Sequence, residues 1–342
     1  MKVKILEKGG EGRWDAFVRN SRSSTSYHQS GWKNVVERTY GHKPFYLFSE
    51  EDKRITGILP LFLIEDMFWG KRLVSLPFAS YGDICSENID TSEGLLAEAD
   101  GIMRDLGARY VELRCRGNTA ANNRPVNDKY VTYVLKLSDG LDNIWRQMNQ
   151  KRRNTIRKAQ KYGLTVELAE SGVQDFYALY ARRMRELGTP VHSCSFFKEL
   201  KAEFPGSTKT MFVRYDGRLV AGLFLLLFNG TMLSGWSASL GEYLYYAPND
   251  LLYWEATKYG CEHGFEYFDF GRSLRDTGIA RFKKEWGGAE VGLKYYYLLN
   301  DTESIPDINL SNPRYDSLSR IWRRLPLIVA NRVGPVVRKR LV

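Results

Sequence analysis

Two adjacent residues, Phe282 and Lys283, carry the strongest chemical signal in the sequence. They lie in the segment ARFKKEWGG, which follows an apolar run typical of a strand, FEYFDF, and a loop, GRSLRDTGI. If that loop leaves the carboxyl end of the strand, Lys283 is held at a cleft by Phe282 and Trp286. A fixed cation there can stabilise the negative charge that develops when an amine attacks an ester or thioester. In the alternative interpretation, Lys283 and Lys284 are solvated charges beside two core aromatic residues.

The signatures of other enzyme classes are absent from the sequence. GWSAS departs at its last position from the nucleophile motif GxSxG, and there is no Walker GxxxxGK, GxGxxG, kinase or zincin motif. The four cysteines form no CxxC pair and the four histidines no HExxH, which disfavours a disulfide framework and a zinc site. The expected chemistry therefore depends on positioning and charge, with no metal and no bound cofactor.

Positive charge is concentrated in one predicted helix. The chain of 342 residues has a formal net charge of +10, which favours polyanionic partners such as nucleic acid, phosphorylated substrates or an anionic membrane face. We interpret one basic segment as a single long helix, DNIWRQMNQKRRNTIRKAQKYG. Its basic face is predicted to bind a polyanion, and the alternative is a face that is only solvated. Its six cations are Lys151, Arg152, Arg153, Arg157, Lys158 and Lys161.

The elements that would position these residues occur in an order that repeats. A helix, a hairpin of two strands, a further helix and a strand can be recognised before residue 140, and a similar series follows. The strongest turn signals are Asp216-Gly217 and Asn229-Gly230. The sequence thus predicts an α/β (α+β) protein with two similar domains, residues 1–140 and 141–300, each with a mixed, mainly antiparallel sheet, followed by a basic amphipathic tail, residues 301–342.

Several of these segments resemble the Fem-type (FemABX) transferases. The run YAPNDLLYWEATKYGCEHGFEYFDFGRS, continued by GIARFKKEWGG, is similar to their Pro-Asn before a Leu-Leu-x-Trp helix, their Asp-Phe-Gly strand end and their Phe-Lys-x-x-(Phe or Trp)-Gly element. NQKRRNTIRKAQKYGLTVE resembles the basic helix of the family, and YHQSGW its Gln-Ser-x-Trp element. The tail is similar to that of short members found with exopolysaccharide and protein-sorting systems.

The resemblance implies two tandem domains of the GNAT acyltransferase fold and transfer of an activated acyl group to an amine. The catalytic Phe-Lys pair of the family maps onto Phe282 and Lys283, with the lysine stabilising transition-state charge. Phosphate-binding residues of the family fall at Lys33 or Arg38 and at Arg183 or Arg185, where a solvated helix face is the alternative. Asn249, in the Pro-Asn element, is a further substrate-binding candidate.

Other residues near the Phe-Lys pair have two interpretations each. Asp269, at the end of the predicted strand, can orient or deprotonate a substrate amine, or cap the following loop. Trp236, Tyr245 and Tyr246 can line the cleft, although aromatic residues in such numbers are more often part of a core.

Three functions follow from these patterns. The leading one is transfer of an aminoacyl group from aminoacyl-tRNA to an amine of a phosphorylated or lipid-linked cell-envelope precursor, such as a peptidoglycan stem peptide. The second is N-acylation of an exopolysaccharide sugar or peptide from acyl-CoA or acyl carrier protein; the third is a non-catalytic RNA- or envelope-binding module. The helical arm of some Fem-type members is absent, and so is the pyrophosphate loop R/Q-x-x-G-x-G/A of ordinary acetyl-CoA-binding enzymes.

The sequence also predicts where the protein acts. It has no run of about 18 apolar residues and no signal peptide at its start, so we expect a cytoplasmic protein. In the tail, arginines alternate with apolar residues, which favours peripheral contact with the inner face of an anionic membrane. Pro326 and Pro335 are expected to break the tail into short pieces, and docking on the second domain is the alternative.

Overall fold

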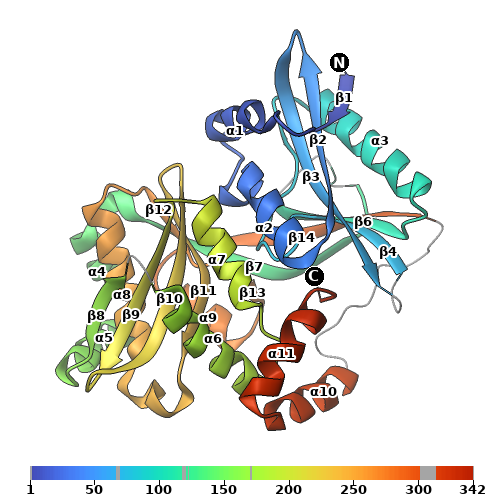
Figure 1. Cartoon of the computed structure of the whole chain (residues 1–342). Helices are drawn as coiled ribbons and strands as arrows, with labels where there is room; N and C mark the ends of the chain where they lie inside the picture. Colours follow the sequence, from blue (N-terminus) through green and yellow to red (C-terminus); the bar gives the residue numbers. More distant parts are fainter. Residues whose placement is uncertain are drawn as a thin grey trace. The chain divides into compact units, whose positions relative to one another are not determined.

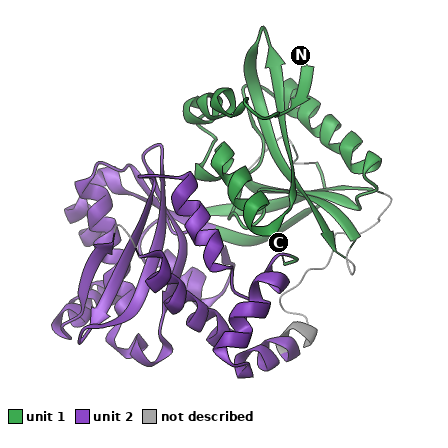
Figure 2. Ribbon diagram, in the orientation of Figure 1, with its two compact units in different colours: residues 1–131, 291–308, 340–342 green, residues 132–290, 309–339 purple. Residues whose placement is uncertain are grey.

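The chain forms two compact units of mixed α/β structure (Figures 1 and 2). This computed structural model describes residues 2–66, 70–117, 121, 123–169, 172–300 and 313–341. Unit 1 comprises Met1–Val131, Val291–Ile308 and Arg340–Val342. Unit 2 comprises Thr132–Glu290 and Asn309–Lys339.

Unit 1 is built on the sheet β1-β2-β3-β4-β6-β14. Neighbouring strands are antiparallel except β4 and β6, which are parallel. A short strand, β5 (Cys85–Ser86), pairs with β3. The main elements are β1 (Lys2–Ile5), α1 (Glu11–Asn20), α2 (Ser30–Tyr40), β2 (Lys43–Glu51), β3 (Arg54–Asp66), β4 (Gly70–Ser75), α3 (Ile89–Asp105), β6 (Tyr110–Arg116) and β14 (Ala289–Leu299).

Unit 2 repeats this order with the sheet β8-β9-β10-β11-β12-β7. Again one pair is parallel, β11 with β12. The strands are β7 (Val126–Lys136), β8 (Thr165–Ala169), β9 (Thr208–Tyr215), β10 (Arg218–Phe228), β11 (Thr231–Ser239), β12 (Tyr267–Asp269) and β13 (Ser273–Leu274). The helices are α4 (Leu141–Gln147), α5 (Gln150–Lys161), α6 (Val173–Leu187), α7 (Cys194–Glu203), the 3-10 helix η3 (Gly241–Tyr246), α8 (Pro248–Glu262) and α9 (Gly278–Lys284).

The two units exchange their last strands. β7 follows β6 in the chain, yet its residues Val134–Lys136 pair with β12 in unit 2. β14 follows the elements of unit 2, yet it pairs with β6 in unit 1, with Tyr296 opposite Leu113. In each sheet the exchanged strand therefore pairs with a strand that is distant from it in sequence.

Local sequence explains the hairpins of unit 2. Asp216 and Gly217 both have positive φ, as do Asn229 and Gly230. A two-residue turn with positive φ at both positions matches the twist of the flanking strands, and Asn, Asp and Gly tolerate it best. The predicted turns between β9, β10 and β11 are confirmed.

The long basic helix predicted before residue 163 is wrong as a single helix. The structure has two, α4 and α5, separated at Met148 and Asn149. The Asn149 side chain accepts a hydrogen bond from the backbone nitrogen of Lys151 at 2.8 Å, so Asn149 is the N-cap that starts α5.

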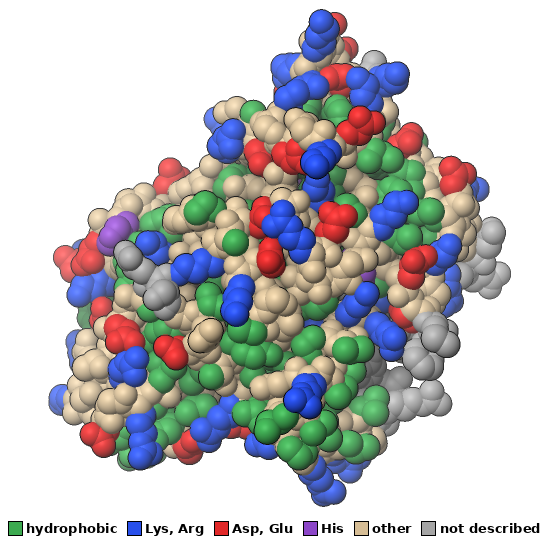
Figure 3. All heavy atoms as spheres, in the orientation of Figure 1, with side chains coloured by type: hydrophobic (Ala, Val, Ile, Leu, Met, Phe, Trp, Pro, Cys, Tyr) green, Lys and Arg blue, Asp and Glu red, His purple; other side chains and the backbone are tan. Residues whose placement is uncertain are grey.

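The tail contains two helices, α10 (Pro313–Arg324) and α11 (Leu327–Arg338). Pro326 separates them as predicted, but α11 continues through Pro335. A proline within a helix removes one backbone hydrogen bond, and α11 accommodates that loss near its end. Figure 3 shows hydrophobic and basic side chains together on the surface of these two helices. The part of the tail at 301–312 lies outside the described residues.

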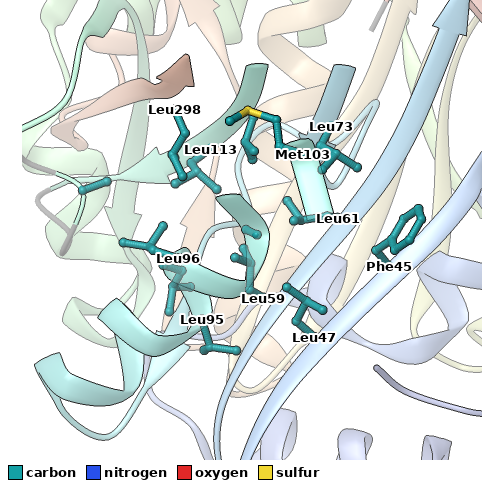
Figure 4. Close-up of a cluster of buried hydrophobic side chains, with 14 of the residues drawn as sticks. Phe45, Leu47, Leu59, Leu61, Leu73, Leu95, Leu96, Met103, Leu113 and Leu298 are labelled. Carbon is teal, nitrogen blue, oxygen red and sulfur yellow. The ribbon is translucent and has the colours of Figure 1, made fainter. Parts of the chain in front are cut away.

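The core of unit 1 shows how a helix is fixed on its sheet. Leu95, Leu96 and Met103 of α3 lie against side chains of β2, β3, β4, β6 and β14 (Figure 4). None of these three side chains is more than 1% exposed. Fully burying each such side chain contributes about 1.5–3 kcal/mol. Leu298, from β14, belongs to the same cluster, so the exchanged strand is part of the core as well as of the sheet.

Candidate functional site

Asp269 is fixed inside unit 2 at the end of β12. Its side chain is fully buried, and Oδ1 accepts hydrogen bonds from Thr132 Oγ1 at 2.5 Å and from the backbone nitrogen of Gly271 at 2.8 Å. The second bond holds the loop that leaves the strand, which is the capping role considered from the sequence. A role of Asp269 toward a substrate amine stays a prediction.

Lys283 reaches the same loop from α9. Thr277 caps this helix, since its side chain accepts a hydrogen bond from the backbone nitrogen of Ala280. The Lys283 ammonium donates to the carbonyl oxygens of Gly271 at 2.8 Å and Arg272 at 3.3 Å. Lys283 is only 7% exposed. The ammonium is therefore held by the backbone of the loop at the end of β12, and not by Phe282 and Trp286 as expected from the sequence, and it is not a solvated charge.

Burial sets the protonation of Lys283. Loss of water around the ammonium lowers the pKa of Lys283 from 10.5 to about 7. The negative charge of Asp269 opposes this change, and the positive charge of Arg272 adds to it. Near neutral pH the group is poised between its two forms, as is common for groups that act on a reacting atom. An adjacent anion or developing oxyanion would favour the charged form.

The side chain of Phe282 lies in different surroundings from that of Lys283. Its ring centroid lies 5.5 Å from that of Tyr253 and 6.1 Å from that of Trp286, and the Arg152 guanidinium lies 4.4 Å from its centre. Successive side chains of a helix point about 100° apart, so Phe282 and Lys283 face different parts of unit 2. In this structure Phe282 packs with aromatic residues while Lys283 turns to the loop.

Arg152 is a buried element of this region that links three helices. It is 8% exposed, and its guanidinium pairs with the carboxylates of Asp250 on α8 and Glu285 just after α9. Burial raises the pKa of Asp250, and the charge of Arg152 opposes that rise. The carboxylates of Asp250 and Glu285 already neutralise Arg152, so Arg152 is not part of the predicted polyanion-binding face. That prediction now applies only to the exposed cations of α5.

Buried polar atoms near these residues were not predicted from the sequence. Ser273 Oγ and Trp286 Nε1 have no hydrogen-bond partner among the described residues, although both residues are more than nine-tenths buried. Tyr253 lies close by, with its hydroxyl 3.0 Å from Ser234 Oγ. A buried donor without a partner is costly, so these groups are candidates for contact with a substrate. Their only sequence signal was their place beside Phe282, Lys283 and the strand end.

The aromatic candidates separate into two groups. Trp236 is half-buried and packs against Phe196 and Phe197, with ring centroids 5.3 and 5.4 Å away. Tyr245, in η3, is 69% exposed, and the Lys158 ammonium lies 4.6 Å from its ring centroid. Tyr246 belongs to that second group through Tyr162, at 5.1 Å. Thus Trp236 takes part in a core, whereas Tyr245 offers an exposed ring beside a cation.

The remaining candidates of unit 2 are each held by neighbours. Asn249 donates to Ser239 Oγ at 3.1 Å. Arg153 donates to the carbonyl oxygens of Trp145 and Arg146 at 3.3 Å, and Arg157 lies 5.2 Å from the Trp145 ring centroid. Arg157 is exposed at the surface of α5.

The four predicted phosphate-binding residues lie on α2 and α6. On α6, Arg183 pairs with Glu186 at 3.2 Å, and Arg185 donates to the carbonyl oxygen of Leu325 in the tail at 3.2 Å. In unit 1, Lys33 of α2 pairs with Glu11 at 3.1 Å, and Arg38 is exposed in the last turn of that helix. Their role in phosphate binding stays a prediction.

Within the described residues there is no group of three or more His, Cys, Asp or Glu side chains that could hold a metal ion. No described helix is long and apolar enough to cross a membrane.

Comparison with known proteins identifies the fold and the class of domain. Residues 146–284 match the family described as acetyltransferase (GNAT) domain. This range contains Lys283 and every other candidate discussed above in α5, α6, α8, β12 and α9. No curated protein matches the chain by sequence.

Solved structures share the arrangement of nearly the whole chain. The crystal structure of FemX is similar with a TM-score of 0.70 and 15% identity, over 88% of this chain and 98% of FemX. The C-terminal domain of a putative lysylphosphatidylglycerol synthetase from Agrobacterium fabrum is similar with a TM-score of 0.59 and 15% identity, over 84% and 91% of the two chains. A tandem GNAT protein from the clavulanic acid biosynthesis pathway has a TM-score of 0.58 and 11% identity, over 89% and 100%.

These likenesses confirm the predicted fold. The repeated strand order of the two units is that of two tandem GNAT-like domains, and the chain has the FemABX-type arrangement expected from its motifs. The chain therefore has the tandem GNAT fold of FemX, and the match of residues 146–284 to an acetyltransferase (GNAT) domain supports a transferase.

Proposed function

We propose that this protein transfers an activated acyl or aminoacyl group to an amine, with Lys283 stabilising the charge that develops on the reacting group. The observation that carries the proposal is the buried ammonium held by the carbonyls of Gly271 and Arg272 at the end of β12. A cation excluded from water is worth more to a developing oxyanion than a solvated one. Its pKa of about 7 makes the charged form accessible near neutral pH.

The reaction needs no covalent intermediate on the protein. The amine nitrogen attacks the carbonyl carbon of an ester or thioester, a C–N bond forms, and the C–O or C–S bond breaks. The amine loses one proton overall, and the leaving oxygen or sulfur takes one. In this scheme Lys283 faces the negative charge of the reacting group. Ser273 Oγ and Trp286 Nε1 offer hydrogen bonds to the acyl donor or to the amine acceptor. Arg152 keeps α9 in position.

For the donor we favour aminoacyl-tRNA. Four exposed cations, Lys151, Arg157, Lys158 and Lys161, lie on α5 within twelve residues, and Tyr245 places an exposed ring beside one of them. Cations that follow a phosphate backbone and rings on which bases stack are the usual parts of a nucleic-acid contact. In addition, the segment between β11 and α8, LGEYLYYA, lacks the Gly-rich pyrophosphate loop of acetyl-CoA-binding GNAT enzymes.

For the acceptor we favour an amine of a phosphorylated or lipid-linked cell-envelope precursor. The fold is shared with FemX and with a putative lysylphosphatidylglycerol synthetase, whose name denotes an aminoacylated phospholipid. An anionic acceptor also fits the net charge of +10.

A second donor remains supported by one observation. The matching family is named for acetyltransferases, which favours a thioester such as acyl-CoA or acyl carrier protein with an exopolysaccharide sugar or peptide as acceptor. The non-catalytic module considered from the sequence is not retained, because the acetyltransferase match favours an enzyme.

The test is a transfer assay with the purified protein. Charged tRNAs and acyl thioesters are supplied in separate reactions with a panel of amine acceptors, and N-acylated products are detected by mass spectrometry. We expect product from charged tRNA, its loss after ribonuclease treatment, and none from acyl-CoA. Product from thioesters alone would replace the donor, and no product with any donor would contradict the proposal.

A further inference from the structure

The tail helices α10 and α11 are fixed on unit 2 through their inner faces. Both pack on α6, and Arg185 of α6 donates to the carbonyl oxygen of Leu325 between them. Gly188, at the end of α6, lies so close to α10 that an added Cβ would stand 2.0 Å from Ser319 Oγ. Gly334 of α11 is also closely packed, since an added Cβ would stand 2.8 Å from Val191 Cγ1. These close approaches leave no room for another partner on the inner side.

The outer face of α11 is apolar and exposed. Ile328 is 70% exposed and Val336 57%, and both lie on the side of the helix opposite the buried Ala330 and Gly334. Helical spacing places the exposed Arg332 between Ile328 and Val336, and the exposed Val329 and Val333 extend this surface along one flank of the helix. The larger apolar side chains of α11 thus face solvent, whereas an ordinary amphipathic helix buries them in the core.

α10 continues the same kind of surface. Leu318 and Ile321, one helical turn apart, are 62% and 61% exposed. Arg320, Arg323 and Arg324 are exposed beside them. Over both helices, apolar and basic side chains intermingle at the surface, as Figure 3 shows for the lower part of the molecule. Scattered exposed apolar residues are ordinary, but a group confined to two helices marks an interaction surface. We call it the tail surface, made of Leu318, Ile321, Ile328, Val329, Val333 and Val336 with Arg320, Arg323, Arg324 and Arg332.

We propose that the tail surface binds the headgroup region of an anionic phospholipid bilayer. Between residues 313 and 341 the sequence has eight Arg or Lys and one acidic residue, Asp316. Helices with this composition lie in the plane of the interface, where apolar side chains enter the acyl boundary and cations meet lipid phosphates. No described helix can span a bilayer, so contact parallel to the surface is the mode that fits.

Charge selects this occupant over two others. A second copy of the chain would bring a second cluster of arginines against the first, and like charges in contact are destabilising. A nucleic acid would satisfy the arginines but would leave Ile328, Val336 and the other aliphatic side chains without apolar contact. Among the side chains of α10 and α11 that the structure describes, no aromatic ring is as exposed as these aliphatic groups. An anionic bilayer satisfies both kinds of side chain.

The experiment is co-sedimentation of the full chain with phospholipid vesicles at low salt. Vesicles of phosphatidylcholine mixed with phosphatidylglycerol are compared with vesicles of phosphatidylcholine alone. We expect the protein to sediment with the first and not the second. The double variant Ile328→Ser/Val336→Ser should weaken binding about tenfold, because two of the inserted side chains are lost. Its control is Ile5→Ser/Ile89→Ser, which removes exposed apolar side chains in unit 1.

The charge contribution is tested separately. The triple variant Arg323→Gln/Arg324→Gln/Arg332→Gln should bind less and with a weaker dependence on salt than the parent. A control with the same change in net charge is Lys2→Gln/Arg104→Gln/Lys129→Gln, at exposed positions of unit 1. Circular dichroism checks that each variant is folded.

Three outcomes would overturn the proposal. One is that the parent binds neither kind of vesicle. Another is that the tail variants and their controls bind equally well. The third is that the parent forms dimers that Ile328→Ser/Val336→Ser dissociates, which would assign the surface to a second copy. None of these measurements uses a donor or acceptor, so their failure leaves the proposed transfer reaction untouched.

Discussion

At the scale of single residues, the proposed reaction depends on how the protein holds a charge away from water. An ammonium with little exposure is unfavourable unless acceptors surround it, and Lys283 has the two carbonyls of the loop after β12. These acceptors are backbone atoms fixed by Asp269 through Gly271. The charge is thereby preorganised for a reacting group, at a cost in stability that should be measurable.

The first prediction concerns the pH dependence of stability. The pKa of Lys283 is lowered from 10.5 to about 7 on folding, so between these values the unfolded chain binds one more proton than the folded one. Stability should therefore rise with pH in this window, by about 1.4 kcal/mol per pH unit. Urea unfolding of the parent and of Lys283→Met, from about pH 7.5 to 9.5, should show this extra slope in the parent alone. Parallel slopes would mean that folded Lys283 keeps its proton.

The second prediction concerns Arg152, whose charge balances Asp250 and Glu285. Replacing it with methionine leaves the buried carboxylate of Asp250 without its cation, and removal of one partner of a buried pair costs about 3–5 kcal/mol. The free energy of unfolding of Arg152→Met should fall by about this amount. The control is Arg214→Met, at an exposed pair with Glu167, where the expected loss is below about 1 kcal/mol. Equal losses would show that the Arg152 cluster is not a structural centre.

At the scale of elements, α5 presents its exposed cations to solvent while Arg152, Ile156 and Ala159 of the same helix are buried. The third prediction is that Lys151→Gln/Arg157→Gln/Lys161→Gln raises the Michaelis constant for the donor about tenfold and flattens its salt dependence. The turnover number should hardly change, because none of the three contacts the Lys283 ammonium. Lys198→Gln/Lys201→Gln/Lys209→Gln, with the same change of charge elsewhere in unit 2, should behave as the parent. An unchanged salt slope in the α5 variant would make this face merely solvated.

Several elements could be predicted because their signals are local. The hairpin turns at Asp216-Gly217 and Asn229-Gly230 need positive φ, which few residues supply, and both were predicted. The break between α4 and α5 was missed although Asn149, a good N-cap, stood at it. Basic periodicity outweighed this capping residue. No element was predicted at α7, although Ser193 is its N-cap.

The candidate site was predicted in part for the same reason. Phe282, Lys283 and Asp269 stand within fifteen residues of one another, so their proximity to one loop could be inferred. Pairing of Arg152 with Asp250 joins residues 98 positions apart. No local pattern reveals which cation of a basic helix turns inward, because that depends on the packing of α5 on α8.

At the scale of the whole molecule, the exchange of β7 and β14 ties the two units together in sequence. A strand that pairs with a distant partner leaves no trace in local periodicity, so VGLKYYYLL was not assigned to the sheet of unit 1. The boundary predicted at residue 140 follows composition. In the structure the chain crosses from unit 1 to unit 2 between Val131 and Thr132, and it crosses back to unit 1 at Val291.

The fourth prediction follows from this exchange. A chain shortened to residues 1–140 contains β6 but lacks β14, so one edge of its sheet is unpaired and its core loses Tyr296 and Leu298. It should not fold as a stable monomer, since an open edge and a missing core strand favour aggregation. Adding residues 289–300 as a separate peptide should restore cooperative thermal unfolding. A well-folded fragment 1–140 without the peptide would contradict the proposed dependence on β14.

Charge stabilisation by Lys283 is tested most directly by the rate of a single turnover in Lys283→Met, measured with the donor and acceptor identified in the transfer assay. Methionine keeps most of the bulk of the side chain and removes its charge, so binding should change little. The rate should fall by about two to three orders of magnitude, the loss typical of deleting one group that stabilises an oxyanion. The matched control is Lys284→Met, at the exposed neighbouring position, which should keep the rate of the parent. An unchanged rate in Lys283→Met, or an equal loss in both variants, would contradict a charge-stabilising role for Lys283.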